Sequence, residues 1–161
     1  MATWRDLQAQ RPGLAAAGRD LLYQFGVGLG FLATVRPDGG PRVHPICPIL
    51  HDERLLAFIV PSPKLLDIRR DGRYALHCFP PADDEDAFYV TGRARVVDDP
   101  ELRDAVARQF VDERTVVEVP PPDDDHALVE LDVETVLVTR TTGHGDPAPD
   151  HTVWKASAIG P

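Results

Sequence analysis

The residues with the clearest chemical potential lie in Pro61–Arg70, where a serine, a proline and a lysine open a short predicted helix. Ser62 is a suitable N-cap, and Pro63 suits the first helical position. The start of a helix carries free N–H groups and the positive end of the dipole, so it attracts anions. Lys64 adds a full positive charge in the first turn, where the dipole disfavours a cation that has no anion beside it. The pattern predicts an anion site; the alternative is a solvated lysine beside an ordinary cap.

A second stretch with chemical potential is Arg42–Cys47. By strand parity Arg42, His44 and Ile46 share one face. The Arg42 guanidinium can form a bidentate contact with a phosphate, and His44 could contact a ring or a substrate. The alternative is that Arg42 only marks the base of a hairpin and that His44 is an ordinary packed or surface histidine.

Metal and nucleophile chemistry find little support in the sequence. The possible ligands His44, Cys47, His77 and Cys78 match no zinc-binding spacing. His77 and Cys78 are adjacent on a predicted strand, so their side chains point to opposite faces. The glycines of Gly26–Gly30 precede a strand instead of following one, so they fail the dinucleotide-binding pattern. We therefore expect no metal site and no cysteine nucleophile.

These residues are positioned by a chain rich in predicted strands. Apolar periodicity and turn signals predict a few helices and a larger number of strands, most of them in the middle of the chain. The expected helices are 4–10, 14–25, 64–71 and one that starts at 99–101, and the expected strands are 30–36, 42–50, 55–60, 74–79, 88–97, 128–140 and 151–154. Consecutive strands joined by short turns favour an antiparallel barrel over a parallel sheet.

Three local features refine this prediction. Pro45 and Pro48 cannot donate ladder hydrogen bonds, so they indicate a sheet edge, a bulge or a strand end. The apolar parity of 128–140 slips between Val133 and Val136, which predicts a bulge. The acidic runs 83–86 and 123–125 are typical of solvated loops.

Composition limits the classes of partner. The chain has 161 residues and a net charge of -9, with an excess of three positive charges before residue 81 and of twelve negative charges after it. This balance argues against sequence-independent nucleic-acid binding and against docking on anionic lipids. Two cysteines and a polar N-terminus without a signal peptide favour a reduced, cytoplasmic protein with no membrane segment. We expect one domain over 1–161, with a helical segment at about 3–25.

The order of these motifs resembles a known family. The strand from Gly30, the Asp-Gly-Gly turn, Pro41–Ile46, the strand 55–60, the Ser-Pro-Lys motif, 66–76 and 88–97 follow one another as in the pyridoxamine 5'-phosphate oxidase-like, FMN-binding split-barrel family. The resemblance is strong over residues 28–98 and weaker toward the C-terminus. It implies a mainly β protein with flanking helices and a six-stranded antiparallel split β-barrel. It also implies a homodimer with FMN at the interface between the subunits.

The resemblance carries over to individual residues. It implies that the phosphate is bound by an arginine on the first hairpin and by the motif that opens the short helix. It implies that the flavin ring lies along the return strand of that hairpin and beside the end of the third strand. The corresponding residues are Arg42, Val43, His44, Pro45, Ile46, Phe58, Ile59, Ser62, Pro63 and Lys64.

The chain departs from true pyridoxamine phosphate oxidases. Those oxidases carry a lysine at the position of Cys47 and a glutamine near the position of Ala87. Their C-terminal arginine and histidine segment has no counterpart. We therefore expect an FMN-dependent oxidoreductase that moves a hydride to or from a small molecule other than vitamin B6, with no catalytic residue assigned. Trp154 either closes over the cofactor or packs in the core.

Other functions remain open at this point. A related cofactor is 8-hydroxy-5-deazaflavin, and its longer anionic tail would require further cations, for which Arg69, Arg70 and Arg73 are available. A non-enzymatic protein could carry flavin, or could bind haem through His44 or His77 as an axial ligand. A structural dimer without a cofactor is the last alternative.

Overall fold

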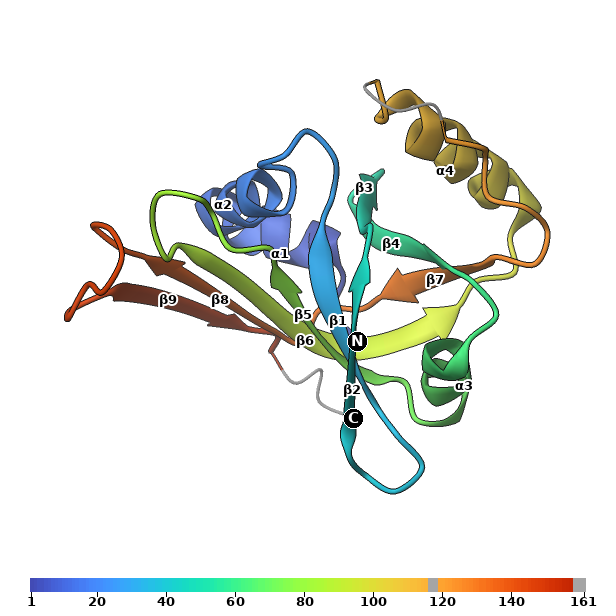
Figure 1. The fold of residues 1–161 in the computed structure, drawn as a ribbon, viewed down its shortest axis with the longest axis horizontal. Coiled ribbons are helices and arrows are strands. Elements are labelled where there is room, and N and C mark those ends of the chain that lie inside the picture. The colour runs from blue at the N-terminus through green and yellow to red at the C-terminus, as the bar shows by residue number, and fades with distance from the viewer. Residues whose placement is uncertain (116–118, 158–161) are drawn as a thin grey trace.

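A curved antiparallel sheet flanked by helices forms the body of the protein (Figure 1). The computed structural model describes residues 1–115 and 119–157. Within them nine strands are ordered β2-β1-β5-β6-β7-β4-β3, and β8 pairs with β6 and with β9. The architecture agrees with a split barrel, but the expected count of six strands is wrong. Two segments expected as single strands, 42–50 and 128–140, are each divided into two strands.

The bounds of the elements stay close to those expected. The helices are α1 (Trp4–Gln10), α2 (Pro12–Leu22), α3 (Pro63–Arg70) and α4 (Pro100–Asp112). The strands are β1 (Gly30–Val35), β2 (Pro41–Ile46), β3 (Ile49–His51), β4 (Arg54–Ile59), β5 (Arg73–Cys78), β6 (Ala87–Val96), β7 (Ala127–Leu131), β8 (Thr135–Arg140) and β9 (Asp150–Lys155).

The first hairpin ends in an edge strand. The turn between β1 and β2 contains Gly39 with a positive φ of 84°, a conformation that glycine adopts readily. Among the described strands β2 pairs with β1 alone, which agrees with the edge position that prolines favour. The expected strand 42–50 stops at Cys47 and Pro48, and β3 then pairs with β4 instead. The sheet therefore changes partner at the proline.

The bulge predicted near residue 133 organises the sheet around β6. β5 pairs with one edge of β6, and β8 and then β7 pair with the other edge. In that second edge the three residues 132–134 lie opposite only Gly92 and Arg93, so one extra residue is inserted and the bulge is confirmed. A Cβ on Gly92 would lie 1.9 Å from the backbone oxygen of Asp132. Only glycine fits this close approach.

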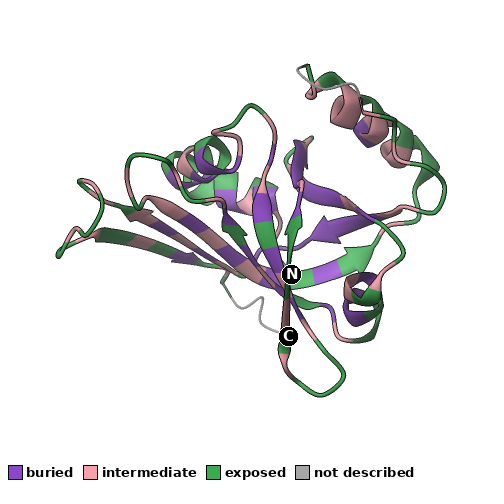
Figure 2. Cartoon of the chain, in the orientation of Figure 1, coloured by how far each residue is buried: buried purple, intermediate pink, exposed green. Residues whose placement is uncertain are grey.

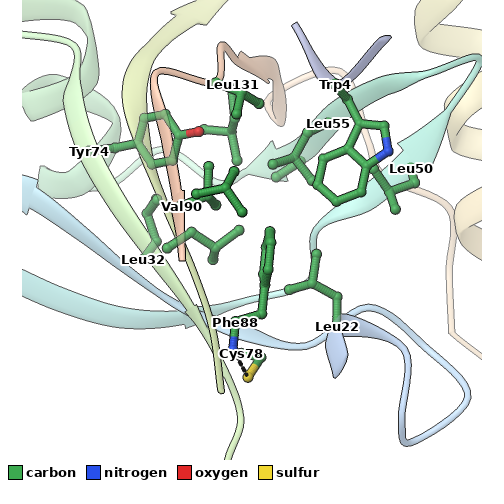
Figure 3. Close-up of a cluster of buried hydrophobic side chains, with 14 of the residues drawn as sticks. Trp4, Leu22, Leu32, Leu50, Leu55, Tyr74, Cys78, Phe88, Val90 and Leu131 are labelled. Atoms are coloured by element: carbon green, nitrogen blue, oxygen red, sulfur yellow. Dashed lines mark hydrogen bonds between the residues drawn. The ribbon is translucent and has the colours of Figure 1, made fainter. Parts of the chain in front are cut away.

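A large apolar core lies between the curved sheet and the N-terminal helices. The buried residues concentrate on the strands beneath α1 and α2 (Figure 2). Phe88 is fully buried, and its ring contacts that of Trp4 edge to face, with centroids 5.9 Å apart (Figure 3). Trp154 is also buried in this core, and its indole N–H donates to Gln10, so of its two expected roles the structure shows packing. α2 ends at Leu22. The prediction that the helix and its apolar stripe extend to Phe25 is wrong, because Phe25 lies beyond the helix and is exposed.

α4 packs on the other side of the sheet through a smaller core and a polar network. The smaller core consists of the buried residues Ile49, Leu56, Val106 and Leu128. The Tyr23 hydroxyl accepts from the Leu50 N–H at 2.9 Å and donates to the Glu113 carboxylate at 3.3 Å. Burial raises the pKa of Tyr23 to about 12, so it stays a neutral donor. These contacts join the end of α2, β3 and the end of α4.

A buried carboxylate attaches the edge hairpin to α3. Asp67 on α3 is 2% exposed and accepts hydrogen bonds from Thr34 on β1 at 3.0 Å and from Arg42 Nε on β2 at 2.8 Å. Arg70 approaches its other oxygen at 3.4 Å. Burial acts to raise the pKa of Asp67, but the hydrogen bonds from Arg42 and Thr34 outweigh it and hold the pKa below its ordinary value. The network fixes where β2 lies along α3.

The bulge gives a first prediction. Gly92→Ala places a methyl group against the backbone of Asp132, so we expect the free energy of unfolding to fall by about 3 kcal/mol or more. Gly13 is the matched control, because it is helical and a Cβ added to it would meet no neighbouring element of the described chain within 4 Å. Gly13→Ala should raise stability by about 0.5–1 kcal/mol through helix propensity. Urea unfolding of both variants measures the difference, and equal stabilities would contradict the role given to Gly92.

The Asp67 network gives a second prediction. Asp67→Asn should lower the free energy of unfolding at pH 7 by about 1–3 kcal/mol, because a charged hydrogen-bond acceptor is lost. Since the folded-state pKa lies below the ordinary 3.8, the ionised carboxylate stabilises the fold above that pH. The contribution is lost as the pH falls through the folded-state pKa.

The measurement is urea unfolding of both proteins at several pH values between 7 and 3. The difference between the wild type and Asp67→Asn should narrow below about pH 4. Asp38→Asn removes an exposed carboxylate that pairs with Arg36, and it should change stability by about 0.5 kcal/mol or less. A difference for Asp67→Asn that does not depend on pH would contradict the ionised network.

Candidate functional site

The anion site predicted from the sequence would lie at the junction of β4 and α3. Ser62 has the extended backbone of an N-cap and Pro63 occupies the first helical position, as expected. The Ser62 hydroxyl, however, donates to the Val60 carbonyl at 2.8 Å and makes no capping bond to the first turn. The first turn of α3 therefore has no side-chain acceptor from its cap. This leaves the positive end of the helix dipole available to a ligand.

Lys64 lies at this helix start with its side chain partly buried. Burial lowers the pKa of its ammonium group, and no carboxylate of the described residues pairs with it to raise the pKa again. A half-buried cation without a counter-charge is unfavourable. An anion bound here would gain both the charge of Lys64 and the helix dipole.

The arginine predicted to share this anion lies along the same helix. Arg42 donates to Asp67, which is buried on α3 one turn after Lys64. The structure thus places Arg42 against the helix that Lys64 opens, although the two residues are 22 positions apart in the sequence. Sequence reasoning missed Asp67, whose carboxylate holds Arg42 there. Arg73, one of the cations considered for a longer ligand, is instead engaged by Asp71 at 2.7 Å.

The residues predicted to line a flavin ring lie in three different environments. On β2, Val43, His44 and Pro45 are exposed, so their side chains are open to a ligand. Ile46 and Ile59 are buried in the main core, which leaves only their backbone for contact with a ligand outside it. The remaining predicted residue, Phe58, is partly buried and lies elsewhere, in an apolar pocket.

That pocket has a volume of about 440 Å³ and joins segments that are far apart in the sequence. Most of its lining is apolar, from the ends of β2 and β4, from α4 and from the segment that precedes β7. The lining residues are Cys47, Phe58, Val60, Phe110, Val119, Pro120, Pro121, Pro122, Asp123 and His126. Phe58 and Phe110 meet edge to face, with centroids 6.1 Å apart. The sequence analysis predicted a solvated loop at 123–125, and this loop is exposed, but it gave no lining role to the residues around it.

A histidine and an aspartate form the polar part of the pocket. His126 Nδ1 lies 2.5 Å from Asp123 Oδ1. The hydrogen bond from His126 is the main cause that holds the pKa of Asp123 below its ordinary value. Arg103 of α4 donates to the backbone oxygens of both residues, and its guanidinium lies 5.3 Å from the centroid of the Phe58 ring. The Asp-x-x-His spacing was the available sequence signal, but nothing in the sequence linked it to Phe58.

Histidines considered as haem ligands lie outside this pocket. His44 and His77 are exposed on β2 and β5, and His77 Nδ1 lies 2.6 Å from the Cys78 carbonyl oxygen. Cys78 faces the opposite way, as predicted, and burial raises the pKa of its thiol. In residues 1–115 and 119–157, no three His, Cys, Asp or Glu side chains gather closely enough to hold a metal ion.

A further finding concerns membranes. Among the helices of the described residues, none has both the length and the apolar character needed to cross a bilayer.

Solved structures share this fold at low sequence identity. A heme binding protein from Mycobacterium smegmatis is 19% identical with a TM-score of 0.62, covering 85% of this chain, which spans 57% of that protein. An F420 reductase is 24% identical with a TM-score of 0.57, covering 73% of this chain and 94% of its own. A NimC/NimA family protein from Clostridium acetobutylicum is 15% identical with a TM-score of 0.59, covering 88% and 94%. These likenesses establish the fold.

Sequence comparison establishes the family. None of the curated proteins is similar enough to the chain to match it. The profile of the pyridoxamine 5'-phosphate oxidase family, however, matches residues 22–140. This range runs from the end of α2 to the end of β8, so it contains the hairpin, the start of α3 and the bulge. The chain therefore belongs to the pyridoxamine 5'-phosphate oxidase family.

Proposed function

We propose that the protein is an FMN-dependent oxidoreductase whose flavin phosphate binds at the start of α3. The observation that carries this proposal is Lys64, a partly buried ammonium at a helix N-terminus that no described carboxylate neutralises. A phosphate is the ligand that fits a helix start with an added cation. Membership of a family that commonly binds flavin makes FMN the phosphate-bearing ligand of choice.

The surrounding residues fit this cofactor. Lys64 and the first-turn N–H groups of α3 bind the phosphate, and Arg42 adds a second cation held in place by Asp67. The exposed segment of β2 at Val43, His44 and Pro45 then lies along the flavin ring, with His44 on one face of the strand and Val43 and Pro45 on the other. FMN, when bound, supplies the hydride chemistry, whereas the protein binds and orients it. Cys47 replaces the lysine of the true oxidases, so the substrate is not a vitamin B6 phosphate.

We further propose that the flavin lies at the interface of a homodimer. Val43 on the edge strand is 58% exposed and Phe31 on β1 is 38% exposed, both high values for apolar side chains in a sheet. The Phe31 ring stacks on Phe79, with centroids 4.4 Å apart, which makes a continuous apolar surface beside β2. A second copy of the chain would remove this surface from water.

One observation supports a deazaflavin as the alternative cofactor. A hollow of about 390 Å³ lies at the C-terminal end of α3, and its lining combines four arginines with two carboxylates: Arg69, Arg70, Arg93, Arg95, Asp71 and Asp132. Arg70 and Arg95 pair with Asp67 and Glu130, so Arg69 and Arg93 are the arginines of this lining without a described carboxylate partner. A cofactor with an anionic tail that starts at Lys64 could extend along α3 toward these cations. The F420 reductase of similar fold is in keeping with this alternative.

Lys64 gives the prediction that tests the phosphate site. Lys64→Gln should weaken FMN binding by about tenfold to a hundredfold, because a charge-assisted hydrogen bond to the phosphate is lost. The chain contains one other lysine, the exposed Lys155, and Lys155→Gln is the matched control with unchanged affinity. Riboflavin lacks the phosphate, so its affinity should be the same for all three proteins. Fluorescence titration measures the dissociation constants.

The same titration separates the alternatives. Binding of 8-hydroxy-5-deazaflavin but not of FMN would favour the reductase alternative, and haem binding alone would make the protein a haem carrier. A loss of FMN and riboflavin affinity by the same factor in Lys64→Gln would contradict a phosphate contact. If neither flavin nor deazaflavin binds the wild type, the proposed function is wrong.

A further inference from the structure

The apolar pocket between β4 and α4 begins at the same strand ends as the proposed flavin site but has a different chemistry. Phe58 and Val60 face it from the end of β4, two residues before Ser62 opens the phosphate site. Cys47 reaches it from the end of β2, directly after the residues proposed to lie along the ring. At the ends of both β2 and β4, residues of the pocket and residues of the proposed flavin site thus lie next to each other in the sequence.

The lining disfavours a charged ligand. No lysine or arginine is among the ten lining residues that the structure describes, and the single carboxylate among them, Asp123, is already engaged by His126. Two guanidinium groups flank the aromatic rings but are already engaged: Arg103 donates to the backbone oxygens of Asp123 and His126, and Arg114 lies over the Phe110 ring and donates to the Phe110 carbonyl. An ionic group in this pocket would therefore lose hydration without gaining a free opposite charge from the lining. Aromatic and proline side chains instead present apolar surface suited to a flat apolar molecule. The volume of about 440 Å³ lies in the range of small-molecule sites.

His126 supplies one directed polar contact. Its Nδ1 is engaged by Asp123, which leaves Nε2 as the ring nitrogen available to a ligand. Arg103 fixes the backbone of both residues by donating to their carbonyl oxygens. The ring is thus oriented by its neighbours before any ligand binds, which lowers the entropy cost of a hydrogen bond to it.

We propose that this pocket binds the substrate of the flavin reaction, and that the substrate is an uncharged aromatic molecule with one hydrogen-bonding group directed at His126. That the ligand is a substrate rests on the proposed function, whereas the existence of a binding site rests on the pocket itself. The phosphate-bearing cofactor finds no cation among the described lining residues of this pocket, and it binds at Lys64 instead. His126 and Asp123 are then specificity residues outside the flavin site.

The test uses three naphthalene probes and the full chain. 2-Naphthol carries one neutral hydroxyl group, naphthalene carries none, and 2-naphthoate carries a negative charge on the same rings. We expect 2-naphthol to bind at least about tenfold more tightly than 2-naphthoate, because only the anion is desolvated without a partner. Equal or tighter binding of 2-naphthoate would overturn the assignment to uncharged ligands.

Variants locate the binding. His126→Asn should weaken 2-naphthol binding about fivefold to tenfold and leave naphthalene binding unchanged, since one hydrogen bond is lost. His144→Asn, on the exposed loop between β8 and β9, is the matched control and should change neither value. Phe110→Leu keeps an apolar side chain beside the smaller core but should weaken both probes by loss of the aromatic wall. Unchanged affinities in His126→Asn and Phe110→Leu would overturn the site.

Competition with the cofactor separates the two proposals. The wild type is titrated with 2-naphthol in the absence of FMN and at saturating FMN. Equal or higher affinity with FMN present supports a substrate pocket beside the flavin. Loss of 2-naphthol binding in proportion to FMN occupancy would mean that the flavin ring itself enters the pocket, which overturns the inference and leaves the proposed function intact. Binding of 2-naphthol by a protein that binds no flavin would refute the proposed function and with it the name of substrate.

Discussion

The close approach of Gly92 to the backbone of Asp132 is the constraint on which the rest of the sheet depends. One edge of β6 pairs with β8 and then with β7 because an extra residue is accommodated opposite Gly92 and Arg93. The extra residue changes the direction of the chain between β7 and β8, so that β8 pairs with β9 whereas β7 pairs with β4. The bulge thereby turns one long strand into the join between the two halves of the split barrel.

That join determines where the functional residues lie. β7 holds β4 in the sheet, and the end of β4 places Phe58 and Val60 toward the apolar pocket while Ile59 enters the core. The chain then turns directly into α3, whose start carries Lys64. An apolar pocket and an anion site therefore follow from a single strand end. The Asp67 network adds the edge hairpin to the same place by fixing Arg42 against α3.

Local patterns predicted much of this fold, and long-range contacts account for the remainder. Alternation of apolar residues located the strands, and a slip in that alternation located the bulge, because both signals lie within a few adjacent residues. The partner of Arg42 could not be predicted, since Asp67 is one of many acidic residues and lies 25 positions away. The pocket was missed for the same reason: Cys47 and His126 share it across 79 positions, and a proline-rich acidic segment is ordinarily solvated.

The edge strand has a further consequence for how copies of this protein can associate. The Arg36 N–H donates to the Gly40 oxygen, so alternate residues of β2 from position 40 onward form hydrogen bonds with β1. The backbone N–H and C=O groups of positions 41, 43 and 45 therefore point away from β1. Two of these three are prolines, so Val43 has the one outward N–H donor among them. A second strand cannot extend the sheet here by a regular ladder, which protects an exposed apolar edge from templated aggregation. Association at this edge must instead proceed through side-chain packing.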